Sequence, residues 1–286
     1  MSDNAFGGRS VDPIVPFLTH NRSFQILKLN NNGLGPAGGV VLANALIESA
    51  KLSKAEGRKS SLRIVICGRN RLEDGSAPVW ADAFAAHGTL EEVCMPQNGI
   101  RMDGITALAR GLAKCPKLRH LDLQDNTFTS DGKVLGIAAW TDAITSWPEL
   151  HTLNLSDCVL STGGEIPTLV AAIANGSNPM IHTLQLQNNN LDTATFELLA
   201  TSVSSSLSGL MRLELQWNEI DEDDEYLETI ALTLKQRGGM LYATDDDEEE
   251  EEEEEEYQEP EEDVKKPVKD EAEDDLANLM SKVNLG

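Results

Sequence analysis

Three consecutive asparagines, Asn30, Asn31 and Asn32, follow the apolar stretch FQILKL and precede Gly33. An amide side chain donates and accepts hydrogen bonds without carrying a charge, so it can orient a neighbouring group. Asn32 stands at a position where asparagine recurs along the chain, and we expect it to have a structural role. Asn31 has no such role, which leaves it free to face another molecule.

Each recurring asparagine, or the cysteine that replaces it once, is preceded by two residues that mostly form hydrogen bonds. Such side chains on a rigid frame are suited to recognising the surface of a folded protein. The pairs are Asn30-Asn31, Gly68-Arg69, Pro96-Gln97, Gln124-Asp125, Ser156-Asp157, Gln187-Asn188 and Gln216-Trp217. Ile26, Ile64 and Ile66 fall on the same expected face, either as an apolar contact or as strand residues covered by their neighbours.

Other chemistries find less support in the sequence. The segment from Gly33 to Gly38 is formally a dinucleotide-binding GxGxxG, after an expected strand and before an expected helix. The turn recurs with other glycine patterns, however, and the next strand ends at Cys67-Gly68-Arg69 without an acidic residue for a ribose. The five histidines show no metal-ligand spacing, and no nucleophile motif is present. We therefore expect no cofactor, no metal and no self-contained enzyme.

The elements that position these residues come from an internal repeat. The template L-x-x-L-x-L-x-x-N-x-L fits seven times, and Asn4 begins an eighth, partial copy. The turn residues are Asn4, Asn32, Asn70, Asn98, Asn126, Cys158, Asn189 and Asn218, at spacings of 28, 38, 28, 28, 32, 31 and 29 residues. A period near 28 is typical of a leucine-rich repeat with a strand and a full helix in each unit. We expect the buried turn residues to hydrogen-bond the neighbouring turns in a ladder.

The predicted fold is an α/β leucine-rich repeat solenoid, a crescent with parallel strands on its concave side and helices on its convex side. Pro36 fits a first helical turn, and Pro116 and Pro148 follow expected helix ends. The long second spacing predicts a polar insertion at Ser49 to Ser61. Asp221 to Tyr242 predicts a polar last helix that caps the array.

We predict two domains, repeats over residues 1–243 and a disordered acidic tail over residues 244–286. The chain opens inside a repeat, at its turn, which we interpret as a truncated chain or an incomplete gene model. The alternative is that residues 1–23 form an irregular cap of their own.

The composition of the chain restricts the kinds of molecule that it can be expected to bind. The 286 residues carry a net charge of −25, and residues 245–286 hold 21 acidic residues against four lysines. Such a chain is not expected to bind nucleic acid, and its partners should carry basic surface. No apolar run predicts a signal peptide or a membrane span. The four cysteines form no CxxC pair, which indicates a reduced intracellular protein.

The tail contains two sequence features of its own. Twelve consecutive carboxylates run from Asp245 to Glu256, and we expect them to be disordered and to attract a basic partner. A solubilising role is the alternative. The last residues carry the spacing of a leucine-rich nuclear export signal, for which a marginal amphipathic helix is the alternative. Its residues are Leu276, Leu279, Val283 and Leu285.

The segments NNGLGPAGG, CGRNRLEDGS and LDLQDNTFT, together with the acidic tail, resemble the Ran GTPase-activating proteins of the shorter fungal type. The resemblance covers residues 2–286, including SDNAFG near the start. It implies a crescent that binds the small GTPase Ran in its GTP form and accelerates GTP hydrolysis, in the cytoplasm or at the nuclear envelope. It also implies a role in nucleocytoplasmic transport.

The resemblance further implies a mechanism without an arginine finger, in which an asparagine holds the catalytic glutamine of Ran against the attacking water. That asparagine matches Asn31, for which a turn-capping amide is the alternative role. Arg69 and Arg71 match family positions on the same edge. We expect them, with Asn30, Gln97, Asp125 and Asp157, to bind the partner.

Two departures accompany the resemblance. Family members carry further repeats before SDNAFG, including a basic loop that helps to engage Ran, and this sequence does not show them. The vertebrate-type C-terminal domain that becomes attached to a ubiquitin-like modifier also has no counterpart. We expect a monomer that accelerates its partner's reaction and is not itself an enzyme. A non-catalytic leucine-rich repeat scaffold is the alternative function.

Overall fold

The computed structural model describes residues 2–4, 7–219 and 224–244. The chain divides into two units, residues 1–247 and 248–286, and every described residue lies in the first. The acidic run from Asp245 to Glu256 and the candidate export signal lie outside the described residues. The boundary expected between residues 243 and 244 therefore stays a prediction.

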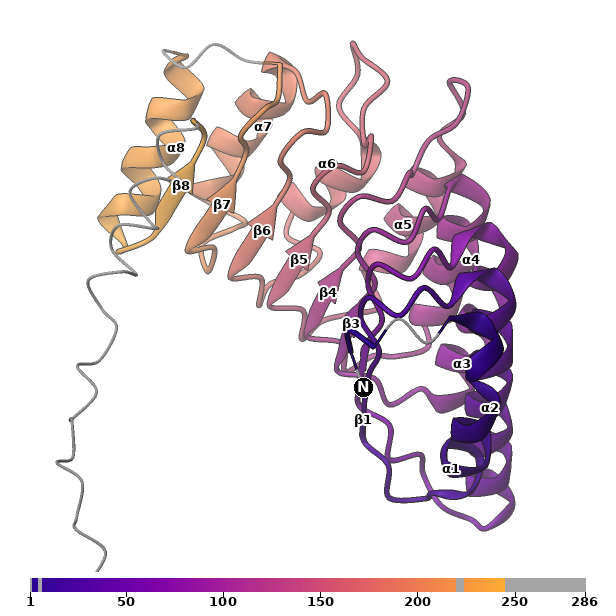
Figure 1. Ribbon diagram of the computed structural model, residues 1–286. Coiled ribbons are helices and arrows are strands. Elements are labelled where there is room, and N and C mark those ends of the chain that lie inside the picture. The colour runs from indigo at the N-terminus through magenta and orange to yellow at the C-terminus, as the bar shows by residue number, and fades with distance from the viewer. Residues whose placement is uncertain (1, 5–6, 220–223, 245–286) are drawn as a thin grey trace, which may run out of the picture. The chain divides into compact units, whose positions relative to one another are not determined.

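Eight short strands form one parallel sheet in which each strand pairs with the next along the chain (Figure 1). Parallel neighbours need a crossover connection, and here a helix or helical segment supplies it between successive strands. The strands are β1 (Ile26–Lys28), β2 (Ile64–Ile66), β3 (Glu92–Cys94), β4 (His120–Asp122), β5 (Thr152–Asn154), β6 (Thr183–Gln185), β7 (Arg212–Glu214) and β8 (Met240–Tyr242).

The helices lie on one side of this sheet, so each unit contributes one strand and one helix to two stacked layers (Figure 1). This confirms the predicted leucine-rich repeat architecture. The helices are η1 (Gly8–Ser10), η2 (Asp12–Ile14), α1 (Val15–His20), α2 (Gly35–Ala55), α3 (Glu73–His87), α4 (Met102–Leu112), α5 (Leu135–Ile144), α6 (Thr168–Ala174), α7 (Thr193–Val203) and α8 (Glu225–Gln236).

The core lies between the two layers. The middle residue of each of the first seven strands is buried, and burial of one such side chain contributes about 1.5–3 kcal/mol. These residues are Leu27, Val65, Val93, Leu121, Leu153, Leu184 and Leu213. They are paired in register along the sheet, so the core is continuous from unit to unit. No unit could bury this face alone.

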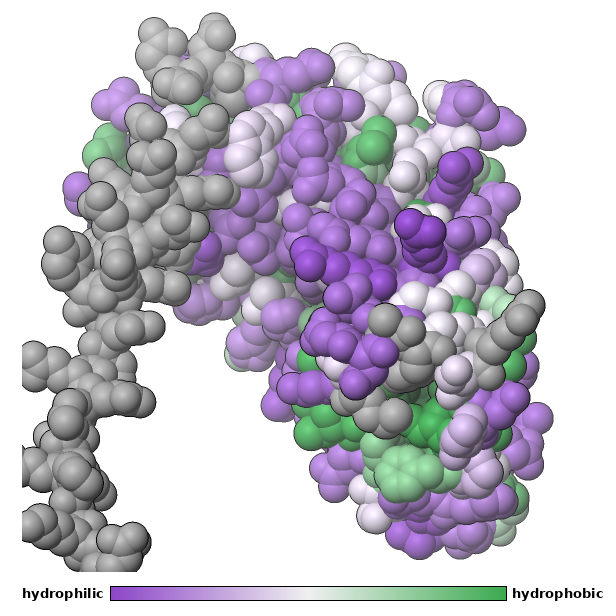
Figure 2. Space-filling model, viewed as in Figure 1, coloured by the Kyte–Doolittle hydropathy of each residue, from purple (hydrophilic) through white to green (hydrophobic). Residues whose placement is uncertain are grey.

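The flanking residues of each strand face away from the helices, on what we call the open face of the sheet. Ile26 is aligned with Ile64 in the next strand, and Lys28 with Ile66, so the three isoleucines share this face as predicted. Ile26 is 48% exposed, and Figure 2 shows a hydrophobic area close to β1.

The insertion predicted at Ser49 to Ser61 is only partly a loop, because α2 continues to Ala55. Its last two turns use alanine, leucine and lysine, which are good helix formers. Ser49, Ala50 and Ser53 are buried on this extension. The extra residues therefore lengthen a helix before they form a loop.

The prediction of a last helix from Asp221 to Tyr242 was wrong at the C-terminal end of that helix. Helix α8 stops at Gln236, and Met240–Tyr242 form an eighth strand aligned with β7. The segment GGMLYAT keeps only Leu241 of the three template leucines and has no turn asparagine, so the repeat pattern did not reveal it. The backbone groups at the edge of β7 account for the pairing, because they need hydrogen-bond partners.

The N-terminal residues continue the repeat at its turn. The Asp3 N–H donates to the Asn30 carbonyl at 2.9 Å, and the Asn4 N–H donates to Asn32 Oδ1 at 3.1 Å. Helix α1 packs on α2 in the way that later helices pack on one another. These contacts fit the prediction that Asn4 belongs to a partial repeat.

Candidate functional site

One backbone conformation recurs at the turn after each strand from β1 to β7. The residue just before each turn asparagine or cysteine has a φ between 48° and 58°, in the left-handed region that side chains other than glycine and asparagine rarely adopt. Asp3, before Asn4, has the same conformation at φ 62°. We call these residues the turn row: Asp3, Asn31, Arg69, Gln97, Asp125, Asp157, Asn188 and Trp217.

Backbone hydrogen bonds hold the turn row in register. The N–H of a turn-row residue donates to a carbonyl in the next turn along the chain, at 2.8–3.0 Å from Asp3 to Asn188. Asn31 donates in this way to Gly68, and Asn188 donates to Gln216. Because the spacing and conformation repeat, the side chains of the row emerge along the same edge of the sheet. All of them are exposed or half-buried.

The ladder of turn residues makes this geometry rigid. Asn32 is fully buried, and its Nδ2 donates to the Leu29 and Asn30 carbonyls at 2.9 and 3.1 Å. Its own N–H donates to Asn70 Oδ1 at 3.0 Å. The same pattern joins Asn70 to Asn98. Cys158 takes the place of an asparagine by donating from Sγ to the Leu123 carbonyl at 3.3 Å. The predicted ladder is confirmed.

Asn31 differs from its neighbour Asn32 in the exposure of its side chain and in its hydrogen bonds. Its side chain is exposed, and its Nδ2 donates to Asp3 Oδ1 at 3.2 Å. Among the described residues, its amide oxygen accepts no hydrogen bond. The side chain is therefore oriented by one bond and keeps its acceptor available. It does not cap its own turn.

Of the two arginines predicted for partner binding, Arg69 follows Asn31 on the turn row and Arg71 lies two residues beyond Arg69. Arg69 Nε donates to Gln97 Oε1 at 2.6 Å, which links two neighbouring turn-row residues. Arg71 follows the turn residue Asn70 and has a φ of 53°, again left-handed, with an exposed side chain. Asn30 was also predicted to bind the partner, but its Oδ1 already accepts a hydrogen bond from the Gly68 N–H at 2.7 Å.

The middle of the row is acidic. Asp157 accepts hydrogen bonds from Asn188 Nδ2 at 2.6 Å and from Gln124 Nε2 at 3.3 Å. Asp125 is exposed, and no described residue bonds its carboxylate. Burial raises the pKa of Asp125, and repulsion by the Asp157 carboxylate raises it further. Of the two carboxylates, Asp125 is the one available to a basic group of a partner.

The turn row also contains three residues that we did not predict as partner contacts, Asp3, Asn188 and Trp217. All three stand at the same offset from a turn asparagine as Asn31 does. That offset was visible in the sequence, but only the repeated φ shows that it defines one edge. Trp217 is 53% exposed, whereas Trp80, Trp140 and Trp147 are fully buried.

The positions of the glycines in the GxGxxG segment are explained by the local structure. Gly33 and Gly35 have φ of 61° and 62°, which glycine adopts without strain. Gly38 faces Gly8 so closely that a Cβ on it would lie 2.8 Å from the Gly8 Cα. The glycine pattern is therefore explained by a turn and by close packing of η1 on α2.

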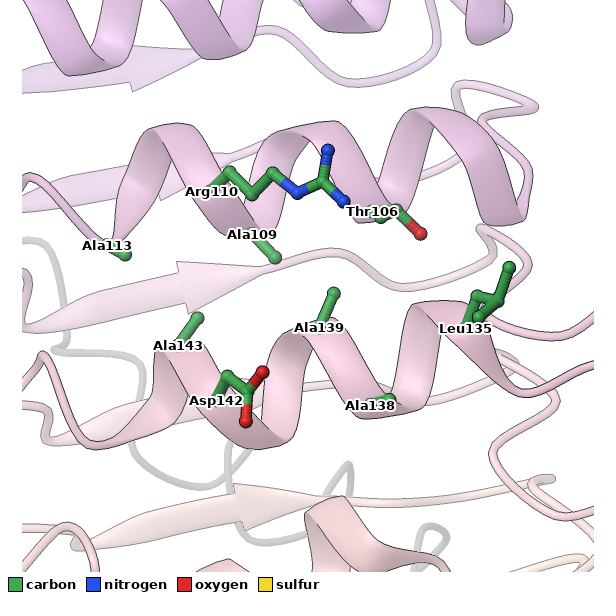
Figure 3. Close-up of a pocket in the computed structure, with 9 residues that line it drawn as sticks. All are labelled: Thr106, Ala109, Arg110, Ala113, Leu135, Ala138, Ala139, Asp142 and Ala143. Atoms are coloured by element: carbon green, nitrogen blue, oxygen red, sulfur yellow. The ribbon is translucent and has the colours of Figure 1, made fainter.

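Two of the cavities in the described part of the chain lie on its surface. One, of about 370 Å³, lies between α4 and α5 on the helix side, and alanines from the two helices face each other across it (Figure 3). The other, of about 580 Å³, lies beside the turn row and includes Asp125. Its further lining residues are Glu73, Asp74, Gly75, Gly99, Arg101 and Thr127.

Within the described residues there is no cluster of three His, Cys, Asp or Glu side chains that could hold a metal ion. No described helix is both long and apolar enough to cross a membrane. The four cysteines are buried and unpaired. Burial raises the pKa of Cys67 to about 12 and that of Cys115 to about 11, so neither thiol is poised as a nucleophile.

Stacked strand–helix units, a buried asparagine ladder and an exposed turn row define this chain as a leucine-rich repeat protein. A family model described as "Leucine Rich repeat" matches residues 20–43 and 114–132. The chain is 35% identical over 237 residues to "Ran GTPase-activating protein 1" of Saccharomyces cerevisiae, covering 80% of this chain and 56% of that protein. It is a homologue of the Ran GTPase-activating proteins.

Two further relatives carry similar names. "Ran GTPase-activating protein 1" of Xenopus laevis is 50% identical over 102 residues, which cover 35% of this chain and 18% of that protein. "Ran GTPase-activating protein 2" of Caenorhabditis elegans is 46% identical over 106 residues, which cover 36% and 11%. The chain spans about half the length of the yeast relative and less than a fifth of these two.

Proposed function

We propose that this chain binds a Ran-type GTPase in its GTP form and accelerates GTP hydrolysis by positioning the GTPase's own catalytic glutamine. The observation that carries the proposal is Asn31, an exposed amide with a free acceptor, fixed on a rigid turn. The names of the relatives support the choice of Ran as the partner.

The chemistry needs positioning more than new functional groups. In GTP hydrolysis a glutamine of the GTPase orients the attacking water, and its mobility keeps the intrinsic rate low. The Asn31 Oδ1 can accept a hydrogen bond from that glutamine's amide, while Asp3 holds the Asn31 amide group in place. Holding reacting groups in the correct geometry contributes large factors in rate without any change in their chemical nature.

The arginines serve binding in this proposal. Arg69 is held against Gln97, and Arg71 is exposed on the same edge. An arginine finger must reach the transferred phosphoryl group. A guanidinium tied to a neighbouring glutamine is better placed to contact the GTPase surface. Asp125 would face a basic group of the partner, and Asp157, held by Asn188 and Gln124, would lie beside that contact.

The remaining features belong to the same proposal. The chain acts as a monomer in the cytoplasm, supports nucleocytoplasmic transport, and contacts neither nucleic acid nor membrane. The carboxylates from Asp245 to Glu256 aid association by attraction over about 8 Å, the screening length at physiological salt. The export signal stays a prediction from the sequence.

Single-turnover hydrolysis of Ran-bound GTP, with and without the full chain, tests the function. We expect acceleration that saturates with chain concentration. Saturable binding to GTP-loaded Ran without acceleration would replace the proposal by the scaffold alternative. Asn188→Ala is a matched control for Asn31, because it removes an exposed amide from the same backbone position five turns along the row. It should leave the rate at saturation high.

A further inference from the structure

Trp217 is the one aromatic residue on the turn row. Its side chain is 53% exposed, and its φ of 58° lies in the region that a bulky side chain rarely adopts. Other members of the row are short or polar, and asparagine occupies the same conformation at positions 31 and 188. Asparagine tolerates this backbone better than tryptophan does. The stability of the turn therefore gives no reason for a tryptophan.

The other tryptophans show how this chain uses the residue for stability. Trp140 Nε1 donates to the Ile105 carbonyl at 2.9 Å, and Trp147 Nε1 donates to the Leu112 carbonyl at 2.9 Å. With Trp80, they are fully buried between the helices and the sheet. Trp217 is instead held outside the core. A ring held outside the core is available for contact with another molecule.

We propose that Trp217 is a second anchor for the GTPase that Asn31 contacts, with its ring buried against the partner's surface when the complex forms. This inference rests on the proposed function. Tryptophan is enriched among the residues that contribute most to protein interfaces, because a rigid ring buries a large area at little entropic cost.

The position of Trp217 fits one folded partner. Neighbouring parallel strands lie about 4.8 Å apart, so the six steps from the turn after β1 to the turn after β7 span roughly 29 Å. A domain of about 100 residues has a radius of gyration of about 13 Å, and its surface can therefore cover that distance. Asn31 and Trp217 mark the two ends of this span. The hydrogen-bonding residues from Arg69 to Asn188 lie between them.

This arrangement separates two tasks along one edge. Asn31 acts on the reaction, whereas Trp217 lies too far along the row to touch the same glutamine. Loss of the ring should therefore weaken binding and leave the rate at saturation unchanged. An aromatic anchor in a polar row also matches the general pattern of interfaces, in which a few buried rings dominate the affinity.

The experiment uses the full chain labelled with 5-fluorotryptophan and unlabelled Ran held with a non-hydrolysable GTP analogue. The chain has four tryptophans, so the ¹⁹F spectrum should contain four resonances. The Trp217→Phe variant identifies the resonance of Trp217. We expect that resonance to shift on binding and to lose its sensitivity to D₂O, while the three resonances of the buried rings keep their chemical shifts.

Affinity measurements on variants complete the test. Trp217→Asn places a residue suited to the turn at this position, and we expect it to weaken binding of GTP-loaded Ran about tenfold or more. Trp217→Phe should recover part of the affinity. Leu232→Asn is the control, since Leu232 on α8 is also 53% exposed but lies outside the turn row.

The possible failures are distinguishable. If Ran binds and hydrolysis accelerates while the Trp217 resonance stays unchanged, the inference is wrong and the proposed function stands. If Ran does not bind the chain and its GTP hydrolysis is not accelerated, both the proposed function and the inference about Trp217 are wrong. A Trp217 shift that grows with the concentration of the chain alone identifies a contact between two copies, which also overturns the inference.

Discussion

The Asn31 Nδ2 donates to Asp3 Oδ1 at 3.2 Å, across two neighbouring members of the turn row. The two residues have almost the same backbone conformation, with φ of 55° and 62°. The carboxylate can only accept from Asn31, so it fixes which end of the amide points outward. The amide oxygen is thereby left available to a partner.

This pairing predicts that Asp3 is a positioning residue. Asp3→Ala should lower the rate of Ran-bound GTP hydrolysis at saturation by about fivefold, because one hydrogen bond of about 1 kcal/mol no longer orients Asn31. Asp3→Asn, which can still accept, should recover most of the rate. Stopped-flow single-turnover kinetics measures both. Equal losses in the two variants would point to charge rather than orientation.

Asn31 and Asn32 should differ sharply in stability. Asn32→Ala removes one of the two donors to the buried Leu29 carbonyl, which keeps Asn70 Nδ2, and removes the acceptor of the Asn4 N–H, at a cost of about 1–3 kcal/mol. Asn31→Ala removes an exposed side chain and should change stability by less than about 0.5 kcal/mol. Thermal and urea unfolding followed by circular dichroism compare them. Similar losses in both would mean that Asn31 is a structural amide.

The arginines allow a direct test of the mechanism. Removal of an arginine finger lowers the rate by about 10³–10⁵-fold. If Arg69 and Arg71 only bind the partner, the double variant Arg69→Ala, Arg71→Ala should raise the half-saturating concentration and change the rate at saturation by less than about threefold. Arg110→Ala on α4, away from the row, is the matched control. A collapse of the saturating rate would make one of these arginines catalytic.

Buried His87 should make stability depend on pH. Burial lowers the pKa of His87 to about 4, and Ser60 Oγ hydrogen-bonds its Nδ1. The unfolded chain, with a histidine pKa near 6.5, binds the proton first as the pH falls. The free energy of unfolding therefore falls as the pH drops from about 6.5 to about 4. About 2 kcal/mol of this decrease occurs by pH 5.

Urea unfolding at pH 7 and pH 5 measures this loss. The variant His87→Gln cannot take up the proton, so its stability should change less between the two pH values. His182→Gln is the control, because His182 is exposed. A full loss at pH 5 in His87→Gln would assign the effect to another group.

The repeat carried most of the fold prediction. The spacing of the leucines and turn asparagines placed seven strands and their helices, because each stacked unit must bury the same face. Strand β8 was not predicted because its segment keeps only one template leucine, Leu241, and has no turn asparagine. The length of α2 was not predicted, because the segment from Ser49 to Ala55 has the composition of a polar loop. The same residues are also compatible with a helix.

The candidate site was predictable in part for the same reason. The sequence showed which residues precede the turn asparagines, and five predicted contacts, from Asn31 to Asp157, lie on the turn row. It could not show the left-handed backbone that gives them one edge, since Arg69 and Trp217 disfavour that conformation. Nor could it show the partner of Asn31, because Asp3 precedes it by a whole repeat.

The most direct test of the proposed function is the rate of Ran-bound GTP hydrolysis with the Asn31→Ala chain, measured in single turnovers across a range of chain concentrations. We predict that the rate at saturation falls by about 100-fold or more, while the half-saturating concentration changes by less than about threefold. An unchanged saturating rate with weaker binding would contradict a positioning role and make Asn31 an ordinary contact.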